Sequence, residues 1–400
     1  MFDVSLGYGG IVKPVRTGII GLGVMGSSHV RDCTESELVE IAALCDINPD
    51  KLKEVASGFE GPTFTDAERM MTEAALEAVI IATPHYDHTP LAISALGRGI
   101  HVLCEKPVGV HVKDVRKMID AYEQARQRKP DIQFGAMFQQ RTVQTWRKIK
   151  ELVAEGTLGK LVRTTVIVTN WFRTQYYYDT GSWRATWSGE GGGVLLNQCP
   201  HNLDLYQWIV GMPNRVHAIA AIGKYHHIEV EDEVTAVFQH ENGMIGHFIT
   251  TTGESPGTDR LEIVGENGRL VLERGVLTLD RNEQSMFEFS NTVQQGFARV
   301  PFETETIEVP HDKGGAHRRV TEAFARAIRE GSPLVAEAPE GLGSVALANA
   351  MLMSHFTGKT VDLPLDGDAY EALLQDLIKK STFQKRATVE PKNIDITESF

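Results

Sequence analysis

The stretch Thr17-Gly-Ile-Ile-Gly-Leu-Gly-Val-Met-Gly26 decides how the first third of this 400-residue chain folds. Its glycines Gly21, Gly23 and Gly26 have the spacing G-x-G-x-x-G. The first permits a tight turn from strand to helix, the second lets the backbone approach a pyrophosphate, and the third lets helix and strand pack closely. The helix that follows presents free N–H groups to the phosphates. The stretch therefore predicts a dinucleotide site.

The residues around these glycines complete a βαβ unit. Arg16–Ile20 predicts a short buried strand, Ser27–Thr34 the start of a helix, and Leu38–Leu44 a second strand that ends beside Asp46. The Asp46 carboxylate can accept hydrogen bonds from the adenosine ribose and would repel a 2′-phosphate. No arginine follows in Ile47–Pro49, so NAD is favoured over NADP. The alternative is that Asp46 only caps the turn into the next helix.

Strand-like apolar runs alternate with helical patterns as far as about residue 138. The runs are Gly18–Ile20, Val39–Leu44, Ala78–Ala82, His101–Cys104 and Gln133–Met137. Such alternation predicts a parallel, doubly wound Rossmann sheet covered by helices. Ligands of these sheets bind beyond the carboxyl ends of the strands, where Gly21, Asp46, Thr83 and Glu105 fall. We therefore expect these four residues in one crevice.

The second half has a different pattern. After a helix over Thr142–Glu155, strand-like stretches follow at Val162–Asn170, Val216–Ile222, Val234–Gln239, Met244–Thr251 and Leu261–Val264. Turn sequences such as Glu241-Asn242-Gly243 predict hairpins, and helices over Arg318–Glu330 and Glu340–Thr357 follow. The predicted fold is α/β: a Rossmann domain (1–140), an α+β domain with a large, mainly antiparallel open sheet (141–365), and a C-terminal helix and tail (366–400).

Composition limits the function classes. A formal charge of −13 and a pI near 5.6, with no basic block, argue against nucleic-acid and anionic-membrane partners. The four cysteines share no C-x-x-C spacing, which predicts reduced thiols and a cytoplasmic protein. We expect no secretion signal over Met1–Pro14 and no membrane span.

Glu105-Lys106-Pro107 brings a charged pair to the crevice at the end of a buried strand. Partial desolvation and a neighbouring cationic nicotinamide would lower the pKa of Lys106 towards neutrality, which suits a group that exchanges a proton with an alcohol. The alternative is a surface lysine that pairs with Glu105.

A second candidate segment runs from Gly191 to Asp204. A helix that started at Gly193 would place Asn197, His201 and Asp204 on one face. Pro200 either bends that helix or marks where the regular helix begins, and we favour a kinked helix at a site. A lone histidine is more often structural, with Asp204 holding its ring, but the neighbouring amide and glycines favour a functional role.

Aromatic and arginine residues precede this segment, in Trp171–Tyr178 and Ser182–Trp187. Aromatic faces with a few polar donors suit a pyranose ring, so Arg173, Tyr176, Trp183 and Arg184 are candidate substrate residues. The alternative is that the tryptophans pack the domain interface. The histidines at 85, 88, 226 and 227 resemble metal ligands by composition only, and we predict no metal site.

Four motifs occur in one order: Gly-Leu-Gly-Val-Met-Gly, Ala82-Thr-Pro-His-Tyr-Asp-His88, Glu105-Lys106-Pro107 and the glycine-to-histidine segment. Over about residues 14–365 the chain resembles the Gfo/Idh/MocA oxidoreductase family. The resemblance implies an NAD(P)-dependent enzyme for sugars or cyclitols, with an open sheet that often forms the oligomer interface. It also implies proton transfer and substrate orientation by Lys106 and His201.

Two positions depart from the family pattern. Asn197 stands where aspartate is usual, and because an amide is no general base, the acid/base role falls to Lys106, His201 or both. Cys199 stands where glycine is common. The expected cofactor residues are Gly21, Leu22, Gly23, Val24, Met25, Gly26, Asp46, Thr83, Pro84, His85, His88, Glu105 and Lys106. The expected substrate residues are Asn197, Arg173, Tyr176, Trp183, Arg184 and Asp204.

We expect hydride transfer between a secondary hydroxyl of a sugar, glycoside or cyclitol and NAD. Among relatives implied by the resemblance, enzymes that oxidise C3 of glucosides or anhydrosugars are favoured because of the aromatic residues, with inositol dehydrogenases as the alternative. A redox-neutral glycoside-cleaving enzyme and a non-catalytic sugar sensor are further alternatives. The expected assembly is a homo-oligomer, a dimer or tetramer formed through the C-terminal sheet.

Overall fold

The first domain is built on a six-stranded parallel sheet. The computed structural model describes residues 13–310, 312 and 314–386. The sheet has the order β3-β2-β1-β4-β5-β6, the strand order of a dinucleotide-binding Rossmann fold. Its strands are β1 (Val15–Ile20), β2 (Val39–Cys45), β3 (Thr63–Phe64), β4 (Ala78–Ile81), β5 (His101–Cys104) and β6 (Phe134–Ala136).

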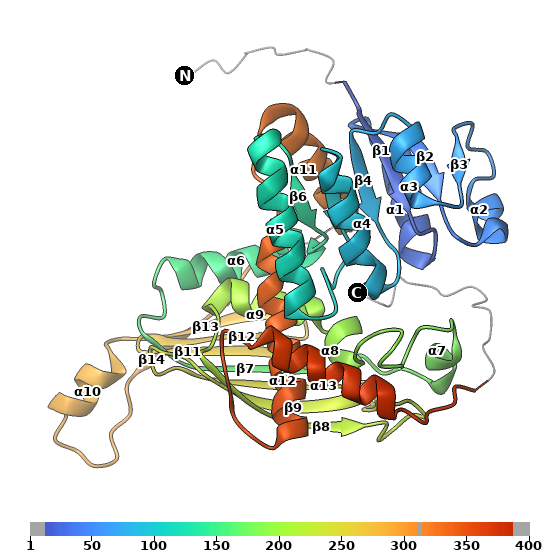
Figure 1. Ribbon diagram of the computed structural model, residues 1–400. Coiled ribbons are helices and arrows are strands. Elements are labelled where there is room, and N and C mark those ends of the chain that lie inside the picture. Colours follow the sequence, from blue (N-terminus) through green and yellow to red (C-terminus); the bar gives the residue numbers. More distant parts are fainter. Residues whose placement is uncertain (1–12, 311, 313, 387–400) are drawn as a thin grey trace, which may run out of the picture.

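Helices cover both faces of this sheet, as Figure 1 shows in blue and teal. They are α1 (Val24–Thr34), α2 (Pro49–Val55), α3 (Ala67–Glu73), α4 (His85–Gly97) and α5 (Val112–Arg128). A later helix, α11 (Ala316–Glu330), returns to pack its Val320 and Phe324 against Ile19 and Leu22 of the first domain. The sequence analysis assigned these residues to the second domain. The structure places them on the Rossmann sheet, because the apolar face of α11 completes that core.

The second domain is a nine-stranded sheet with the order β14-β13-β12-β11-β7-β10-β9-β8-β15. Its strands are β7 (Leu161–Val168), β8 (Arg215–Ile222), β9 (Glu231–Gln239), β10 (Ile245–Thr251), β11 (Asp259–Gly265), β12 (Gly268–Glu273), β13 (Val276–Asn282), β14 (Phe302–Ile307) and β15 (Val361–Asp362). All neighbouring pairs are antiparallel except β7 with β10. The predicted fold class, a Rossmann domain with a mainly antiparallel second domain, is confirmed.

Helices pack on one face of the large sheet. They are α6 (Gln144–Ala154), α9 (Pro200–Val210) and α12 (Gly341–Thr357), and α12 runs along β8 (Figure 1). Strand β8 alternates accordingly: Val216, Ala218 and Ala220 are buried, while Ile219 is 69% exposed. Among the described residues, none of these helices covers the other face of the sheet, where Ile219 is exposed.

Shorter elements connect these layers or end the chain. They are η1 (Gln139–Thr142), α7 (Gln175–Asp179), α8 (Val194–Asn197), α10 (Met286–Thr292), η2 (Ala338–Glu340) and α13 (Gly367–Lys380). All four cysteines are buried and free, as the sequence predicted. Within the part of the chain that the structure describes, no helix is long and apolar enough to cross a membrane.

Candidate active site

A cleft of about 730 Å³ is lined by residues from both domains. The structure brings Gly21, Asp46, Thr83 and Glu105, which follow four different strands, together in its wall. The second domain contributes Trp171, Arg173, Tyr177, Thr180, Gly181, Trp183, Arg184, Asn197, Gln198 and His201. Polar atoms of Thr83, Trp171, Gln198 and His201 are buried here without a hydrogen-bond partner among the described residues. Such unsatisfied atoms are expected where a polar ligand binds.

The three glycines of the turn after β1 have different steric environments, which explain why each position is a glycine. Gly21 has a φ of +85°, and a Cβ built on it would lie 2.7 Å from the carbonyl oxygen of Ala82. A Cβ on Gly26 would lie 1.8 Å from the carbonyl oxygen of Gly21, so this glycine lets α1 pack against the turn. A Cβ on Gly23 would have no heavy atom within 4 Å. Gly23 lines the cleft at the start of α1, and this open space fits the approach of a pyrophosphate.

Asp46 lines the cleft and also holds the glycine turn. Its Oδ2 accepts a hydrogen bond of 2.7 Å from the amide of Leu22, and its Oδ1 accepts one of 2.8 Å from the amide of Asn48. Asn48, and not Asp46, caps α2. Leu22 is itself fully buried and contributes to the turn through its backbone, so its side chain does not line the cleft.

Of these two predicted cofactor residues, the structure places His85 in the cleft lining and His88 outside it. His85 lines the cleft, with its ring 5.2 Å from that of Trp183 and its Nδ1 3.2 Å from the carbonyl oxygen of Glu190. His88 does not line the cleft, because both its ring nitrogens contact backbone carbonyls, of Pro107 at 2.8 Å and Thr83 at 2.9 Å. His88 therefore braces two loops rather than facing a ligand.

Lys106 projects into the cleft from the end of β5. Its Nζ donates a hydrogen bond of 2.9 Å to the carbonyl oxygen of Asn197, in the other domain. Burial lowers the pKa of Lys106 from its ordinary value of 10.5, against the opposing charge of Glu105. Glu105 does not form an ion pair with Lys106, since its Oε1 lies 2.8 Å from Nε2 of His29. Burial would raise the pKa of Glu105, but the contact with His29 outweighs it and lowers the value to about 2.

His201 lies in the cleft with one ring nitrogen engaged. Its Nε2 is 3.0 Å from the amide nitrogen of Gln139, whereas its Nδ1 has no partner among the described residues. Burial lowers the pKa of His201 well below the ordinary 6.5, and the charge of Lys106 acts in the same direction. The imidazole is therefore neutral at physiological pH.

Asn197 is held by a buried carboxylate that the sequence analysis missed. The amide nitrogen of Asn197 donates to Oε1 of Glu190, and its Oδ1 accepts 3.0 Å from the hydroxyl of Tyr177. The other oxygen of Glu190 accepts 2.7 Å from the amide of Ala185. Burial raises the pKa of Glu190, against the opposing charge of Arg184. Its position just before the glycine cluster was the only sequence signal for this residue.

The predicted kinked helix is two helices, and Asp204 faces away from the cleft. Helix α8 ends at Asn197 and α9 begins at Pro200, where the missing amide hydrogen costs no helical bond. Asp204 is 1% exposed and forms hydrogen bonds of 2.7 and 2.8 Å with the guanidinium of Arg141. It touches neither His201 nor the cleft, so the structure does not support it as a substrate residue.

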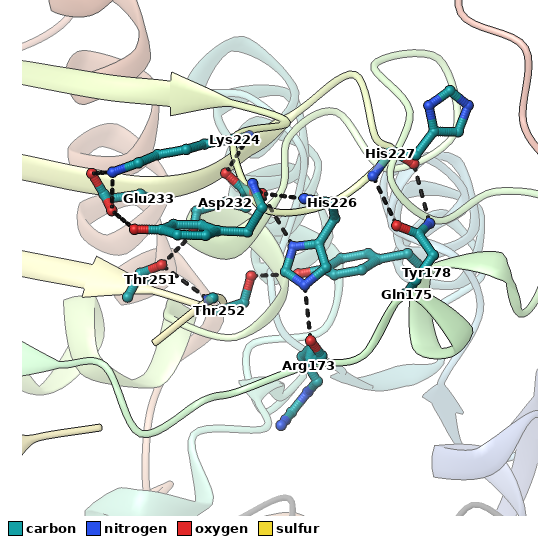
Figure 2. A network of polar contacts seen from close by, with 12 residues as sticks. Arg173, Gln175, Tyr178, Lys224, His226, His227, Asp232, Glu233, Thr251 and Thr252 are labelled. Carbon is teal, nitrogen blue, oxygen red and sulfur yellow. Dashed lines mark hydrogen bonds and ion pairs between the residues drawn. The ribbon is translucent and has the colours of Figure 1, made fainter. Parts of the chain in front are cut away.

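The aromatic wall contains Tyr177 in place of Tyr176. Tyr176 is 46% exposed and does not line the cleft, whereas the ring of Tyr177 lies beside both cleft arginines, at 5.3 Å from Arg173 and 4.7 Å from Arg184. Trp183, Arg173 and Arg184 line the cleft as the sequence predicted. His226 contacts Asp232 and the backbone of Arg173 (Figure 2).

The fold and the cleft define a two-domain oxidoreductase with an NAD-binding Rossmann fold. The model of the oxidoreductase family with an NAD-binding Rossmann fold matches residues 15–129, and that of the GFO/IDH/MocA C-terminal domain matches residues 146–271. The matches cover more than half of the chain, which therefore belongs to the Gfo/Idh/MocA oxidoreductase family. The predicted family and the predicted cofactor, NAD, are confirmed.

Curated relatives span several substrates. The chain is 32% identical to the rhizopine catabolism protein MocA of Rhizobium meliloti over 49% of this chain, and that match covers 57% of the relative's length. It is 25% identical to myo-inositol 2-dehydrogenase of Thermotoga maritima, over 64% of this chain and 74% of the relative. It is 24% identical to levoglucosan dehydrogenase of Pseudarthrobacter phenanthrenivorans, over 88% and 99%.

Among solved structures, the WlbA dehydrogenase from Bordetella pertussis in complex with NADH and UDP-GlcNAcA matches with a TM-score of 0.74 and 25% identity. That match covers 88% of this chain and all of the other. Levoglucosan dehydrogenase in complex with NADH matches with a TM-score of 0.73 and 22% identity, over 88% of this chain and all of the other, which supports the fold.

Proposed function

We propose that the protein is an NAD-dependent dehydrogenase that oxidises a secondary hydroxyl of a sugar, glycoside or cyclitol. The observation that carries this proposal is Lys106, a partly buried amine in the same cleft as the glycine turn. Relatives named inositol and levoglucosan dehydrogenases support the substrate class. Within it we favour C3 oxidation of a glucoside or anhydrosugar, because Trp171, Tyr177 and Trp183 offer rings for a pyranose. An inositol is the alternative.

NAD, when bound, supplies the acceptor for the hydride from the carbinol carbon. Gly21, Gly23 and the first amides of α1 would hold its pyrophosphate, and Asp46 its ribose. Thr83 and His85 line the stretch of cleft between this turn and Lys106 and would contact the rest of the cofactor.

Lys106 accepts the hydroxyl proton at Nζ in this proposal. Its lowered pKa increases the neutral fraction of the amine near physiological pH, as a general base requires. The carbonyl oxygen of Asn197, 2.9 Å from Nζ, fixes the direction in which the amine points. A base that is already held in place loses less orientational entropy in the reaction than a mobile base, which lowers the activation barrier.

His201 orients the substrate oxygen. With the Gln139 amide as placed, its nitrogen can only donate to Nε2, so the proton of the neutral ring is on Nδ1. Nδ1 can then donate a hydrogen bond to the substrate hydroxyl but cannot take its proton. We therefore assign proton transfer to Lys106 and orientation to His201.

The test is NADH formation from NAD with a panel of glucosides, anhydrosugars, aldoses and inositols, for the wild-type protein and for Lys106→Ala. The control is Lys148→Ala, on the exposed face of α6. Turnover that Lys106→Ala abolishes and Lys148→Ala keeps supports the proposal. Sugar release without net NADH would instead indicate redox-neutral cleavage, and NAD binding with no turnover of any kind would indicate a sensor.

We further propose that the protein is a cytoplasmic homo-oligomer that assembles through the open face of its large sheet. Ile219 on β8 and Val237 on β9 are 69% and 36% exposed on this face. Buried free cysteines fit a reducing compartment. Light scattering after size-exclusion chromatography would give a dimer or tetramer, and Ile219→Asp should reduce its mass to that of smaller species.

A further inference from the structure

Two arginines at the second-domain side of the cleft have no acidic partner. Arg173 and Arg184 both line the cleft, and neither guanidinium has a carboxylate oxygen within 4.0 Å among residues 13–310, 312 and 314–386. The Nη1 of Arg173 donates 3.1 Å to the carbonyl oxygen of Phe172, and that of Arg184 donates 2.7 Å to the hydroxyl of Tyr177. Each arginine therefore keeps several N–H donors for a ligand.

The two guanidinium groups lie beside the same aromatic ring, that of Tyr177. Their central carbons lie 5.3 and 4.7 Å from the same point, the ring centroid of Tyr177, so they are within about 10 Å of one another. Each also lies over a tryptophan, Trp171 at 5.4 Å and Trp183 at 4.6 Å. Stacking on aromatic rings fixes the planes of the guanidinium groups while leaving their edges available for hydrogen bonds.

Arg173 is anchored through its backbone. Its amide donates 2.9 Å to the carbonyl oxygen of Thr252, and its carbonyl oxygen lies 2.8 Å from Nε2 of His226. The other nitrogen of His226 is 3.1 Å from the buried carboxylate of Asp232. Figure 2 shows the side chain of Arg173 pointing away from this network. These hydrogen bonds hold the backbone of Arg173, and so they fix the position from which its side chain extends.

Glu190 interacts with Arg184 through its charge, but the two residues form no ion pair. Both charged residues that the second domain contributes to the cleft lining are arginines, and the acidic lining residues all come from the first domain: Asp46, Asp87 and Glu105. The nearby Glu190 is occupied by Asn197 and the amide of Ala185, and burial raises its pKa. In a chain with a net charge of −13, two such arginines stand out.

We infer that the substrate carries a carboxylate, as in a uronic acid or its glycoside, and that Arg173 and Arg184 bind it. This inference rests on the proposed oxidation. Within the proposed substrate class it selects sugars and glycosides that carry a carboxylate, in place of neutral ones. A half-buried cation without a carboxylate partner has lost hydration, and a carboxylate ligand restores the lost hydrogen bonds with two parallel contacts to a guanidinium edge. Both arginines act as specificity residues and take no part in proton transfer.

The test compares two substrates that differ only at C6, methyl β-D-glucuronide and methyl β-D-glucoside, by kcat/KM with NAD. We expect the glucuronide to be preferred by about 10- to 100-fold, the range for charged hydrogen bonds. Arg173→Gln and Arg184→Gln should each reduce that preference, whereas Arg128→Gln, an exposed arginine at the end of α5, should keep it. A ratio of two substrates on one enzyme preparation does not depend on how much of the variant is folded.

Equal or better use of the glucoside would overturn the inference, and so would a preference that survives both substitutions. A preference for D-glucose 6-phosphate over the glucuronide would also overturn the carboxylate assignment. If no sugar is oxidised at all, the proposed function fails, and the inference is then decided by thermal stabilisation with NAD present. D-Glucuronate should raise the melting temperature more than D-glucose, and Arg173→Gln or Arg184→Gln should remove the difference.

Discussion

The Nζ of Lys106 lies 2.9 Å from the main-chain carbonyl oxygen of Asn197, so the candidate base of the first domain is held by the backbone of the second. The contact uses a main-chain atom and does not depend on the side chain at position 197. This explains how the position can carry an amide in place of the aspartate usual in the family. The Asn197 amide is then free to join Tyr177 and Glu190.

This arrangement predicts a pH dependence. Because burial lowers the pKa of Lys106 below 10.5, oxidation should rise with pH through a limb below that value, and reduction should fall over the same range. The charge of Glu190 raises the pKa of Lys106, so Glu190→Gln should move the limb to lower pH. The measurement is the pH profile of kcat in both directions. Glu241→Gln, in an exposed hairpin turn, is the control, and an unmoved limb in Glu190→Gln would contradict the coupling.

Substitutions of two glycines should separate folding from cofactor binding. Gly23→Ala adds a methyl group into open space at an ordinary φ of −62°, so stability should change by less than about 0.5 kcal/mol. NAD binding should weaken about 5- to 150-fold, because the methyl group would occupy the space we assign to the pyrophosphate. Gly26→Ala would force the Gly21 carbonyl to move and should lower the melting temperature. Calorimetric NAD titration and thermal unfolding check both, and unchanged affinity in folded Gly23→Ala would refute the placement.

Asp204 should act on stability and not on the substrate. Asp204→Asn removes the negative charge that faces Arg141, whose side chain is 2% exposed. Leaving a buried charge without any partner costs about 3–5 kcal/mol, but Arg141 keeps its ion pair with Glu340, so we expect a smaller loss of stability, which urea unfolding would detect. Asp376→Asn, in the exposed pair with Lys380, should cost less than about 1 kcal/mol. If Asp204→Asn raised KM and left the stability at the wild-type value, this prediction would be wrong and Asp204 would be a substrate residue.

Cofactor choice should change at the end of β2. Asp46→Ser together with Ile47→Arg removes the charge that would repel a 2′-phosphate and adds one that attracts it, at a position that is 88% exposed. We expect the ratio of kcat/KM for NADP to that for NAD to rise about tenfold or more. Ile47→Arg alone should have a smaller effect, because Asp46 is still present. An unchanged ratio in the double variant would show that Asp46 only holds the Leu22 amide.

The cofactor half of the site could be predicted because its signals are local. The spacing of Gly21, Gly23 and Gly26 and the apolar runs that end at Asp46 and Glu105 are readable within short windows of sequence. Parallel strands then bring these ends together without any further information. The position of Lys106 could be predicted for the same reason, because it follows the same strand as Glu105.

The substrate half depends on contacts between distant residues. Helical spacing predicted Asp204 beside His201 at the site, but Arg141, which lies 63 residues earlier, binds Asp204 outside the cleft lining. In the short helix α7, successive side chains are rotated by about 100°, and this rotation determines that Tyr177 and not Tyr176 lines the cleft. Glu190 lies in an irregular loop with no periodic pattern, and its role is visible only once Asn197 lies against it.

Strand β7 takes both of its neighbours from chain that is synthesised later, β10 at 245–251 and β11 at 259–265. During translation this strand leaves the ribosome with two unpaired edges, and 83 further residues (169–251) must be made before the first edge can pair with β10. Open edges of apolar strands pair with other chains, so aggregation competes with folding during this interval. A lower growth temperature weakens apolar association between chains and should therefore raise the soluble yield of this protein, even where its finished fold is stable.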